Sequence, residues 1–412
     1  MSNGNSSFSK KFSSGAMITL LLVVMAPQLG LSVITPSFAR MASDLNVNVA
    51  QLQWTTTIYM AGYALSMFVG GFLAEKYDAV KLQAFGLIVF SIGSILCAFS
   101  GSIFPLSAGR FLQALGGGGG GTSATVLCRL IIRRRIDPAF RIAPLANLTM
   151  VISLTPALAP LLGGVASLFF PWRAIFVVLA VLGITLSLLC LGFLGSAKAD
   201  EPSLPSLAST LSSIGASLSN LSYLWYSAAL ALVWMSYFGF LALSPGFFET
   251  NYGITGISYG VLMLWPAVGY WFGSYLIKHT ANPTKFAHTS IMVSGLVALA
   301  VLLVGLVAPL LPAWVVIAIL CTQFIGVGAT IPYSQNGQLA LPLPLPGVST
   351  GLFFFIQMMS GAVYAAVANS FEATSFRSVL AFVAAPQLVL GLAFVAISLI
   401  GGGGKFRVPT RK

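Results

Sequence analysis

Long apolar runs separated by short polar stretches follow one another along this 412-residue chain. A run of about 20 apolar residues is what an α-helix needs to cross the hydrocarbon core of a bilayer, where every backbone amide must be paired inside the helix. We therefore expect an all-α membrane protein. Twelve transmembrane helices are predicted, over residues 17–38, 52–73, 82–101, 104–131, 142–168, 173–195, 222–248, 257–277, 287–309, 311–333, 347–370 and 377–402.

The longest polar interruption, residues 196–221, is rich in Ser and Pro and divides the predicted helices into six and six. Two six-helix bundles joined by a polar linker are typical of transporters built from repeated halves, which bind their substrate near the membrane midplane. The predicted organisation is an N-terminal bundle over residues 1–195, a cytoplasmic linker over 196–221 and a C-terminal bundle over 222–412.

Charged residues make up only 7% of the chain, and the basic ones are unevenly distributed. With a cytoplasmic N-terminus, sixteen of the 20 Lys and Arg fall in cytoplasmic segments, and only Arg40, Arg173 and Arg377 fall outside. This asymmetry follows the positive-inside rule and predicts that both termini are cytoplasmic. The basic tract at 129–135 then anchors the topology beside lipid headgroups, and no nucleic-acid partner is expected.

Six consecutive glycines, residues 116–121, raise the question of a phosphate-binding loop. Such a loop ends in Lys followed by Ser or Thr, whereas here Thr122 and Ser123 follow the glycines directly. Unwinding in lipid would leave amides unpaired, so the helix is expected to continue. The glycines, for example Gly117 and Gly121, then permit close packing against a neighbouring helix.

Arg110 is the basic residue that lies farthest inside a predicted span, since Arg129, Arg173 and Arg377 are at or near span ends. A cation at the centre of a membrane helix costs at least about 2.5 kcal/mol on insertion scales, so it normally faces a cavity or a partner. Gln113, one turn further on, can share its hydrogen bonding. We expect Arg110 to border a water-filled route; the alternative is that it reaches the outer surface.

Amide and aromatic side chains in the spans are candidates for the wall of a substrate cavity, because they suit ligands of mixed polarity. An arginine without a facing carboxylate favours neutral or anionic solutes over cations. The four cysteines are isolated and His279 and His288 are expected in a solvated loop, so no metal site and no cofactor are predicted. The cavity candidates are Gln28, Ser32, Tyr59, Tyr63, Arg110, Gln113, Asn147, Trp234, Tyr237, Trp265 and Gln357.

Several motifs resemble those of the major facilitator superfamily, and more closely its Bcr/CflA-type bacterial drug-resistance transporters. RFLQALG at 110–116 resembles the fourth-helix motif, and LTPALAPLLGGVASLFFPWRAIF at 154–176 resembles the fifth-helix antiporter signature. SPGFFETNYGIT at 244–255 and PGVSTGL at 346–352 resemble parts of helices seven and eleven. The resemblance runs the full length. It implies the major facilitator fold, alternating access and proton antiport, and we expect a monomer in the bacterial inner membrane.

The fifth-helix stretch also predicts a conformational hinge. Pro156 and Pro160 bend a helix because proline lacks the amide donor, and Gly163 and Gly164 permit tight contact with a helix of the opposite half. A bent and closely packed helix between the bundles is suited to act as a hinge or as a seal against ion leak.

The loop between helices two and three departs from the family pattern. In GFLAEKYDAVKL, Gly71 matches, and Glu75 and Lys76 replace the usual acid and base, whereas residues 77–79 break the pattern. The resemblance implies a cytoplasmic latch formed by Gly71, Glu75, Lys76 and Arg129 that pairs charges between conformations. The departures predict that this latch is weakened.

Proton coupling has weak support in the sequence. Many relatives carry an acid four residues before the first-helix proline, where this chain has Ser32 before Pro36. None of the eight acids is central to a predicted span. Glu249, near the outer end of the seventh span, is the remaining candidate carrier, and a solvated carboxylate at a helix end is the alternative.

The expected function is proton-coupled efflux of drugs or small amphipathic solutes. Export or uptake of a small anionic metabolite, such as a carboxylate siderophore, is the alternative, and a membrane receptor that transports nothing would keep the same topology. A membrane enzyme or an ATP-driven pump is disfavoured, because the sequence shows neither a catalytic Ser/His/Asp grouping nor a P-loop.

Overall fold

The computed structural model describes residues 12–117, 124–199, 204–254, 256–307, 311–370 and 376–399. The described part of the chain is helical throughout and contains no strand. Its elements are α1 (Ser14–Ser32), η1 (Thr35–Ser37), α2 (Phe38–Leu45), α3 (Val49–Leu73), α4 (Ala79–Ala98), α5 (Ile103–Gly117), α6 (Ala124–Arg135), η2 (Pro138–Phe140), α7 (Ile142–Phe169), α8 (Trp172–Phe193), α9 (Leu207–Ser219), α10 (Leu221–Tyr252), α11 (Gly256–His279), α12 (Pro283–Val307), α13 (Ala313–Leu339), α14 (Pro346–Ser370) and α15 (Phe376–Leu399).

Each predicted transmembrane span has a helical counterpart. Ten described helices are long and apolar enough to cross a membrane, and the bent α7 is an eleventh. The twelfth, expected over 104–131, corresponds to α5 and α6 on either side of residues 118–123. The prediction that the helix continues through the glycine run concerns these residues, which lie outside the described part of the chain. Gly116 does pack closely, since a Cβ there would lie 2.0 Å from the backbone N of Phe90 on α4.

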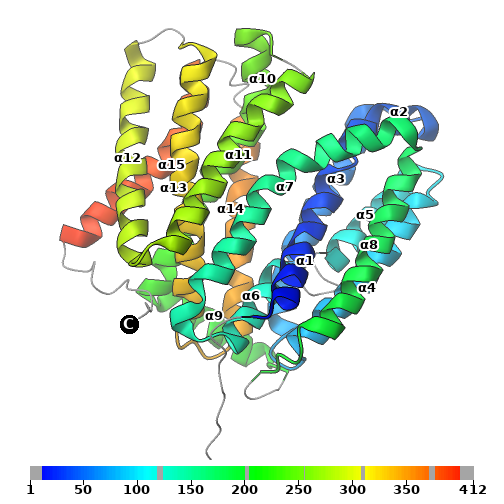
Figure 1. The fold of residues 1–412 in the computed structure, drawn as a ribbon, viewed down its shortest axis with the longest axis horizontal. Coiled ribbons are helices and arrows are strands. Elements are labelled where there is room, and N and C mark those ends of the chain that lie inside the picture. The colour runs from blue at the N-terminus through cyan, green and yellow to red at the C-terminus, as the bar shows by residue number, and fades with distance from the viewer. Residues whose placement is uncertain are drawn as a thin grey trace, which may run out of the picture.

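The helices form two bundles that meet at one end of the molecule (Figure 1). Helices α1 to α8 pack on one another, as do α10 to α15, while α7 against α11 and α13, and α3 against α14, connect the bundles. We call the end that carries α9 and the α13–α14 connection the linker face. From this face the bundles diverge toward the opposite end, which we call the far face (Figure 1).

Helix α7 bends by 45° between the segments that end at Pro156 and begin at Leu158. The prolines explain the bend, since each removes a backbone donor from the helix. A Cβ on Gly163 would lie 1.8 Å from the carbonyl O of Val33, which belongs to the same bundle, and Gly164 has no such neighbour within 4 Å. The predicted contact of these glycines with the opposite half is therefore wrong. Helix α7 does contact α11 and α13 of the C-terminal bundle.

Asp78 is the last residue of the loop between α3 and α4, and its side chain forms hydrogen bonds with the start of the linker. Its Oδ1 accepts from the Val80 amide at 2.8 Å and the Lys81 amide at 3.2 Å, as an N-cap does, and its Oδ2 accepts from the Ala197 amide at 2.8 Å. Burial opposes ionisation, but these bonds and the Ser196 hydroxyl outweigh it and lower the pKa of Asp78. The residue that breaks the family pattern therefore has a capping role.

Candidate functional site

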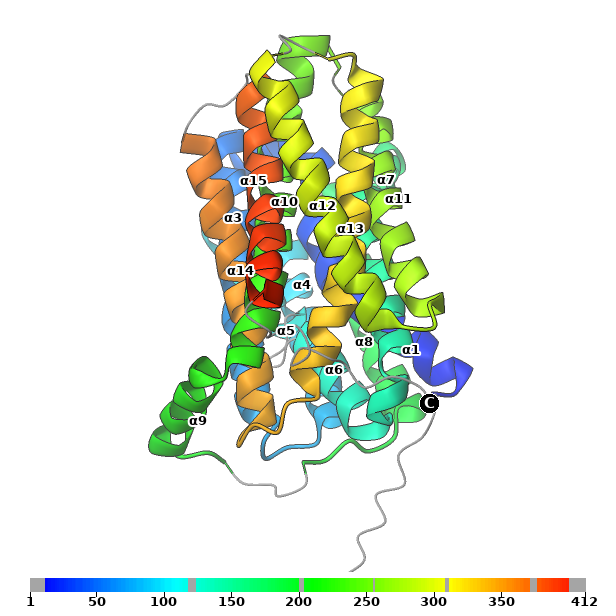
Figure 2. The ribbon, with the colours of Figure 1, turned by 90° about the vertical axis from the view of Figure 1, so that its left-hand side faces the viewer.

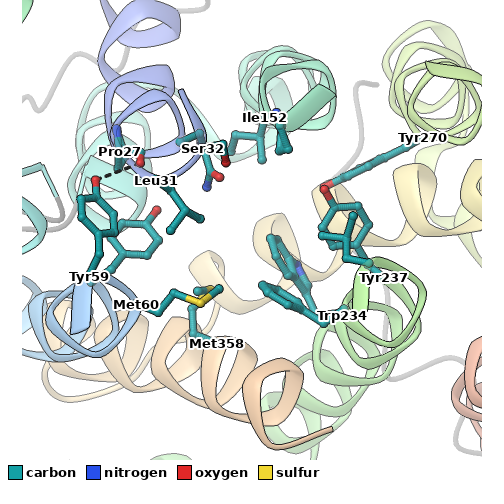
Figure 3. A pocket seen from close by; sticks show the side chains of 15 residues that line it. Pro27, Leu31, Ser32, Tyr59, Met60, Ile152, Trp234, Tyr237, Tyr270 and Met358 are labelled. Carbon is teal, nitrogen blue, oxygen red and sulfur yellow. Dashed lines mark hydrogen bonds between the residues drawn. The ribbon is translucent and has the colours of Figure 1, made fainter. Parts of the chain in front are cut away.

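A cavity of about 90 Å³ lies between the two bundles (Figure 3). Side chains of α1 and α3 form one wall, those of α10, α11 and α14 the other, and Ile152 and Pro156 of α7 border it. Sequence reasoning missed its apolar members, because nothing in their pattern distinguishes a cavity wall from a packed core. The predicted residues that line it are Gln28, Ser32, Tyr59, Tyr63, Trp234 and Tyr237. The missed residues include Met60, Phe238, Leu241, Tyr270 and Met358.

A second, polar cavity of about 10 Å³ shares Gln28, Tyr63, Trp234 and Tyr270 with the first. It has room for about one water molecule. Arg129 of α6 lines it, and no acidic side chain of the described residues lines either cavity. Five polar atoms of its wall are buried without a hydrogen-bond partner in the described part of the chain: Arg129 Nε, Trp234 Nε1, Tyr270 Oη, Gln335 Oε1 and Gln357 Oε1. Such groups need a water or a polar ligand group to satisfy them.

Arg129 lies in the cavity wall and not in the predicted latch. Its Nη1 donates to the carbonyl O of Thr125 at 2.7 Å, and its guanidinium lies 4.8 Å from the ring centroid of Phe354 on α14. The prediction that it pairs charges with the loop after α3 is therefore corrected. Arg129 instead places a cation between the bundles at the polar end of the cavities.

The side chain of Glu75 connects the two bundles through hydrogen bonds at the linker face. Its Oε1 accepts hydrogen bonds from the backbone amides of Gly347 and, at 3.2 Å, Val348, which are in the first turn of α14. These amides have no partner within their own helix, and the helix dipole favours a carboxylate there. The latch thus joins a side chain to a helix end, which the sequence, read as a charge pair, did not anticipate.

Gly71 and Gly347 bring the backbones of α3 and α14 into direct contact beside Glu75. A Cβ on Gly71 would lie 2.2 Å from the carbonyl O of Gly347, and a Cβ on Gly347 would lie 2.3 Å from that of Gly71. Nearby, Arg133 Nε donates at 2.9 Å to the carbonyl O of Leu339 at the end of α13. Lys76 is exposed and stacks over Tyr77, so its predicted share in the latch is not seen.

The geometry of two helical bundles around a central cavity can be compared with known proteins. The sequence model of the Major Facilitator Superfamily matches residues 20–366, which is most of the chain. The chain belongs to the major facilitator superfamily. Two solved structures share this superfamily's fold. The human organic anion transporter MFSD10 (TETRAN) has a TM-score of 0.69 at 14% identity and covers 92% of this chain and 99% of its own. The proton:xylose symporter XylE has a TM-score of 0.71 at 12% identity, with 95% and 97% covered.

Sequence relatives of the chain are named as multidrug resistance proteins. The multidrug resistance protein MdtL of Escherichia coli O45:K1 (strain S88) is 32% identical over 182 residues, which are 44% of this chain and 45% of that protein. MdtL of Salmonella paratyphi A (strain ATCC 9150) is 32% identical over 184 residues, with the same coverage. The matched stretch thus spans less than half the length of these relatives. The chain is a multi-pass membrane protein, and its motif resemblance to drug-resistance transporters is confirmed.

The arginine of the superfamily's fourth-helix motif lies behind the cavity wall. Arg110 is 1% exposed and lines neither cavity. Its Nη1 donates to the carbonyl O of Gly30 at 2.6 Å and to Gln113 Oε1 at 2.7 Å, and its guanidinium lies 4.3 Å from the ring centroid of Tyr59. The expectation that Arg110 borders the route is corrected: the Tyr59 ring lines the cavity, and Arg110 supports that ring.

Several other candidates lie outside the cavity wall. Gln113 is buried and donates to Ser94 Oγ at 2.8 Å, Asn147 is half-buried, and Trp265 is 57% exposed on α11. Glu249 is exposed near the end of α10. None of these four lines either cavity, whereas Gln357 lines the polar one.

His288 does not lie in a solvated loop as expected. It lies within α12, half-buried, with its Nε2 2.9 Å from the hydroxyl of Tyr333 on α13. His288 is the second residue of the span predicted over 287–309, and the observed helix begins four residues earlier, at Pro283, so the imidazole lies more than one turn inside α12. Pro is favoured in the first turn of a helix, so this start was readable from the sequence.

Replacing Glu75 tests whether the latch depends on hydrogen bonding. Glu75→Ala leaves two buried amides unpaired, at about 1–3 kcal/mol for each unsatisfied group, and should separate the bundles at the linker face. Glu75→Gln keeps an acceptor oxygen and should retain most of the closed population. Fluorescence transfer between labels at Tyr77→Cys and Ala340→Cys measures the separation. Equal opening in both variants would show that the charge, not the acceptor, holds the latch.

The pH response of the latch follows from the same carboxyl. Burial raises the pKa of Glu75 above its usual 4.5, against the opposing effect of the two α14 amides. A raised pKa means that the closed latch favours the protonated form, so closure strengthens as pH falls and is lost as pH rises through the raised value. Glu75→Gln should abolish this dependence in the same fluorescence measurement.

Proposed function

We propose that this transporter exports amphipathic drugs across the bacterial inner membrane by alternating access, driven by proton antiport, with both termini cytoplasmic. The observation that carries the proposal is the cavity between the bundles, lined by aromatic rings, methionines and amides and closed at the linker face by Glu75 and Gly71. Such walls suit ligands of mixed polarity. The names of the MdtL relatives as multidrug resistance proteins support drug efflux.

In this proposal residues 1–195 and 222–412 rock against each other, and residues 196–221 connect them. The linker face would lie in the cytoplasm, so the described conformation is closed to the cytoplasm. Opening there requires Gly347 and Glu75 to separate, while the bend near Pro156 lets α7 keep its contact with α11. Pro156, Pro160, Gly163 and Gly164 then act as the hinge. The transporter works as a monomer, since each cavity is complete within one chain.

The charge of the wall favours uncharged or anionic drugs. The apolar body of a substrate would lie against side chains such as Met60, Leu241 and Met358, and its polar end would point to Arg129 and Gln357. No carboxylate of the described residues is present in the wall to balance a cation, and the only charge there is that of Arg129. A cationic drug should therefore bind less well than an uncharged one of the same size.

Flux into proteoliposomes under an imposed pH gradient tests the function. A panel of uncharged, anionic and cationic drugs should show gradient-driven movement of the first two. No gradient-driven flux of any panel member by folded protein would contradict the proposal. Glu249→Gln should keep its flux because this carboxylate is exposed and lines neither cavity; loss of coupling in that variant would make Glu249 the proton carrier.

Ser32→Asp should move the preference toward cations. Ser32 lines the cavity at the position where many relatives carry an acid. Two opposite charges 4 Å apart gain about 4 kcal/mol at an effective dielectric constant of 20. Desolvation offsets part of this, so we expect about a tenfold gain in cationic over uncharged flux, since tenfold corresponds to 1.4 kcal/mol. Ser32→Asn, of the same size without charge, is the matched control and should leave the ratio unchanged.

A further inference from the structure

Helix α9 lies within the linker, where the sequence predicted only a polar connection. Its inner side is polar: Thr210, Ser213 and Ser217 are buried, at 7%, 1% and 0% exposure, against α10 and α14. Polar residues toward the protein and leucines away from it reverse the arrangement of a helix on a water-soluble domain. The leucine side therefore needs an apolar environment that the described chain does not supply.

The exposed leucines of α9 form one stripe. Leu207, Leu211 and Leu218 are 77%, 58% and 45% exposed, and their spacing of four and seven residues aligns them on a helix. A second exposed row has small side chains and lies on a different side, at a spacing of three and four residues. It consists of Ser209, Ser212 and Ala216. The helix thus has three sides, facing the protein, an apolar phase and water.

The position of α9 identifies the apolar phase. Figure 2 shows α9 at the linker face beside the lower ends of α10 and α14. The next leucines along the chain, Leu221 and Leu224 at the start of α10, are 61% and 40% exposed and belong to a membrane span. Asn220, the one residue between the two helices, caps α10 through its Oδ1, which accepts from the Tyr223 amide at 3.0 Å. The leucine stripe therefore lies on a helix that directly precedes, and packs against, a membrane-spanning helix with exposed leucines at its start.

We propose that α9 is an interfacial helix whose leucine stripe inserts into the linker-side leaflet of the bilayer. Helix α9 carries no charged residue, so attraction to anionic headgroups does not contribute. Insertion depends on apolar burial and thus on lipid packing. Because α9 joins α10, which carries Trp234 and Tyr237 of the cavity wall, lipid packing acts on a helix of the site. The inference holds whether or not the proposed substrate is correct.

Spin labels on the full-length protein in phosphatidylcholine vesicles test the insertion. Labels at Leu207→Cys, Leu211→Cys and Leu218→Cys should be relaxed more by oxygen than by a water-soluble nickel complex. Labels at the controls Ser212→Cys and Ala216→Cys, on the side that faces water, should show the reverse. Cys321→Ser removes the one native cysteine that is not buried. Adding phosphatidylglycerol should leave the oxygen-to-nickel ratio of the leucine labels unchanged.

Three results would overturn the proposal. Nickel-dominated relaxation at all positions would place α9 in water. Leucine labels shielded from both reagents, and released on dilution of the protein in lipid, would show that a second copy covers the stripe. A ratio that rises severalfold with phosphatidylglycerol would show that charge and not apolar burial drives the contact. All labelled positions are exposed, so these variants should fold.

Discussion

Gly71→Ala should open the transporter at the linker face. The added methyl group would meet the carbonyl O of Gly347 at 2.2 Å and the Cα of Gly351 at 2.9 Å, both backbone atoms that no rotamer change can move. Overpacking of this kind costs about 1–3 kcal/mol, which changes a population ratio by about 5–150-fold. The two bundles separate here without breaking a core, so the cost acts on the closed conformation and not on folding.

Labelling of a buried cysteine measures that opening. Met67 lines the polar cavity and is 1% exposed, so Met67→Cys should react slowly with a membrane-impermeant maleimide applied at the linker face. In the Gly71→Ala background the reaction should be about 5–150-fold faster. Gly347→Ala, whose Cβ would lie 2.3 Å from the Gly71 carbonyl O, should act alike. Gly192→Ala on α8, with open space around it, is the control. Unchanged labelling in both interface variants would refute a glycine-sealed closure.

The hydrophobic pattern was sufficient to predict the fold. Runs long enough to cross a bilayer and a single long polar interruption require paired helices in two groups, and the structure and the family match agree. The pattern could not predict α9. Its Ser-rich segment reads as a loop because serine is common in loops, although Leu207, Leu211 and Leu218 recur with helical spacing.

The residue types of the cavity wall could be predicted from the sequence, but the direction in which each side chain points could not. Tyr59, Trp234 and Tyr237 were found because aromatic rings in a span suit a cavity wall. Arg110, expected in the cavity wall, lies behind it, whereas Arg129, expected in the latch, lies in the wall. A membrane cation requires polar partners, but backbone carbonyls such as that of Gly30 can supply them without any signal in the sequence.

The same reasoning explains how Glu75 contacts the opposite bundle although the loop sequence around it is altered. The family pattern suggests paired side-chain charges, and this chain keeps the acid at Glu75 while residues 77–79 differ. A helix N-terminus needs only an acceptor, and any sequence of the first turn of α14 offers its amides. Glu75 therefore holds Gly347 and Val348 without help from Lys76. The basic residues of a charge-pair motif can be lost without loss of the contact when the acid binds backbone amides.

Arg110→Ala should destabilise the N-terminal bundle more than it alters substrate choice. Arg110 of α5 joins Gly30 of α1 and Gln113, and Gln113 in turn donates to Ser94 of α4. The guanidinium also supports the ring of Tyr59, whose hydroxyl donates to the Pro27 carbonyl at 2.9 Å. Truncation removes the donor to the Gly30 carbonyl and to Gln113 Oε1, at about 1–3 kcal/mol for each buried group left unsatisfied, out of a typical total stability of about 5–15 kcal/mol.

Thermal unfolding in detergent, read beside flux in proteoliposomes, separates this role from a direct one. Arg110→Ala should lower Tm by many degrees, and the protein that remains folded should keep its preference among drugs. Lys285→Ala removes an exposed basic side chain and should change stability by no more than about 0.5 kcal/mol. An Arg110→Ala protein with unchanged Tm and no flux would mean that this cation acts on substrate or proton directly. The cavity would then have to open behind Tyr59 during transport, since in the described conformation the ring lies between them.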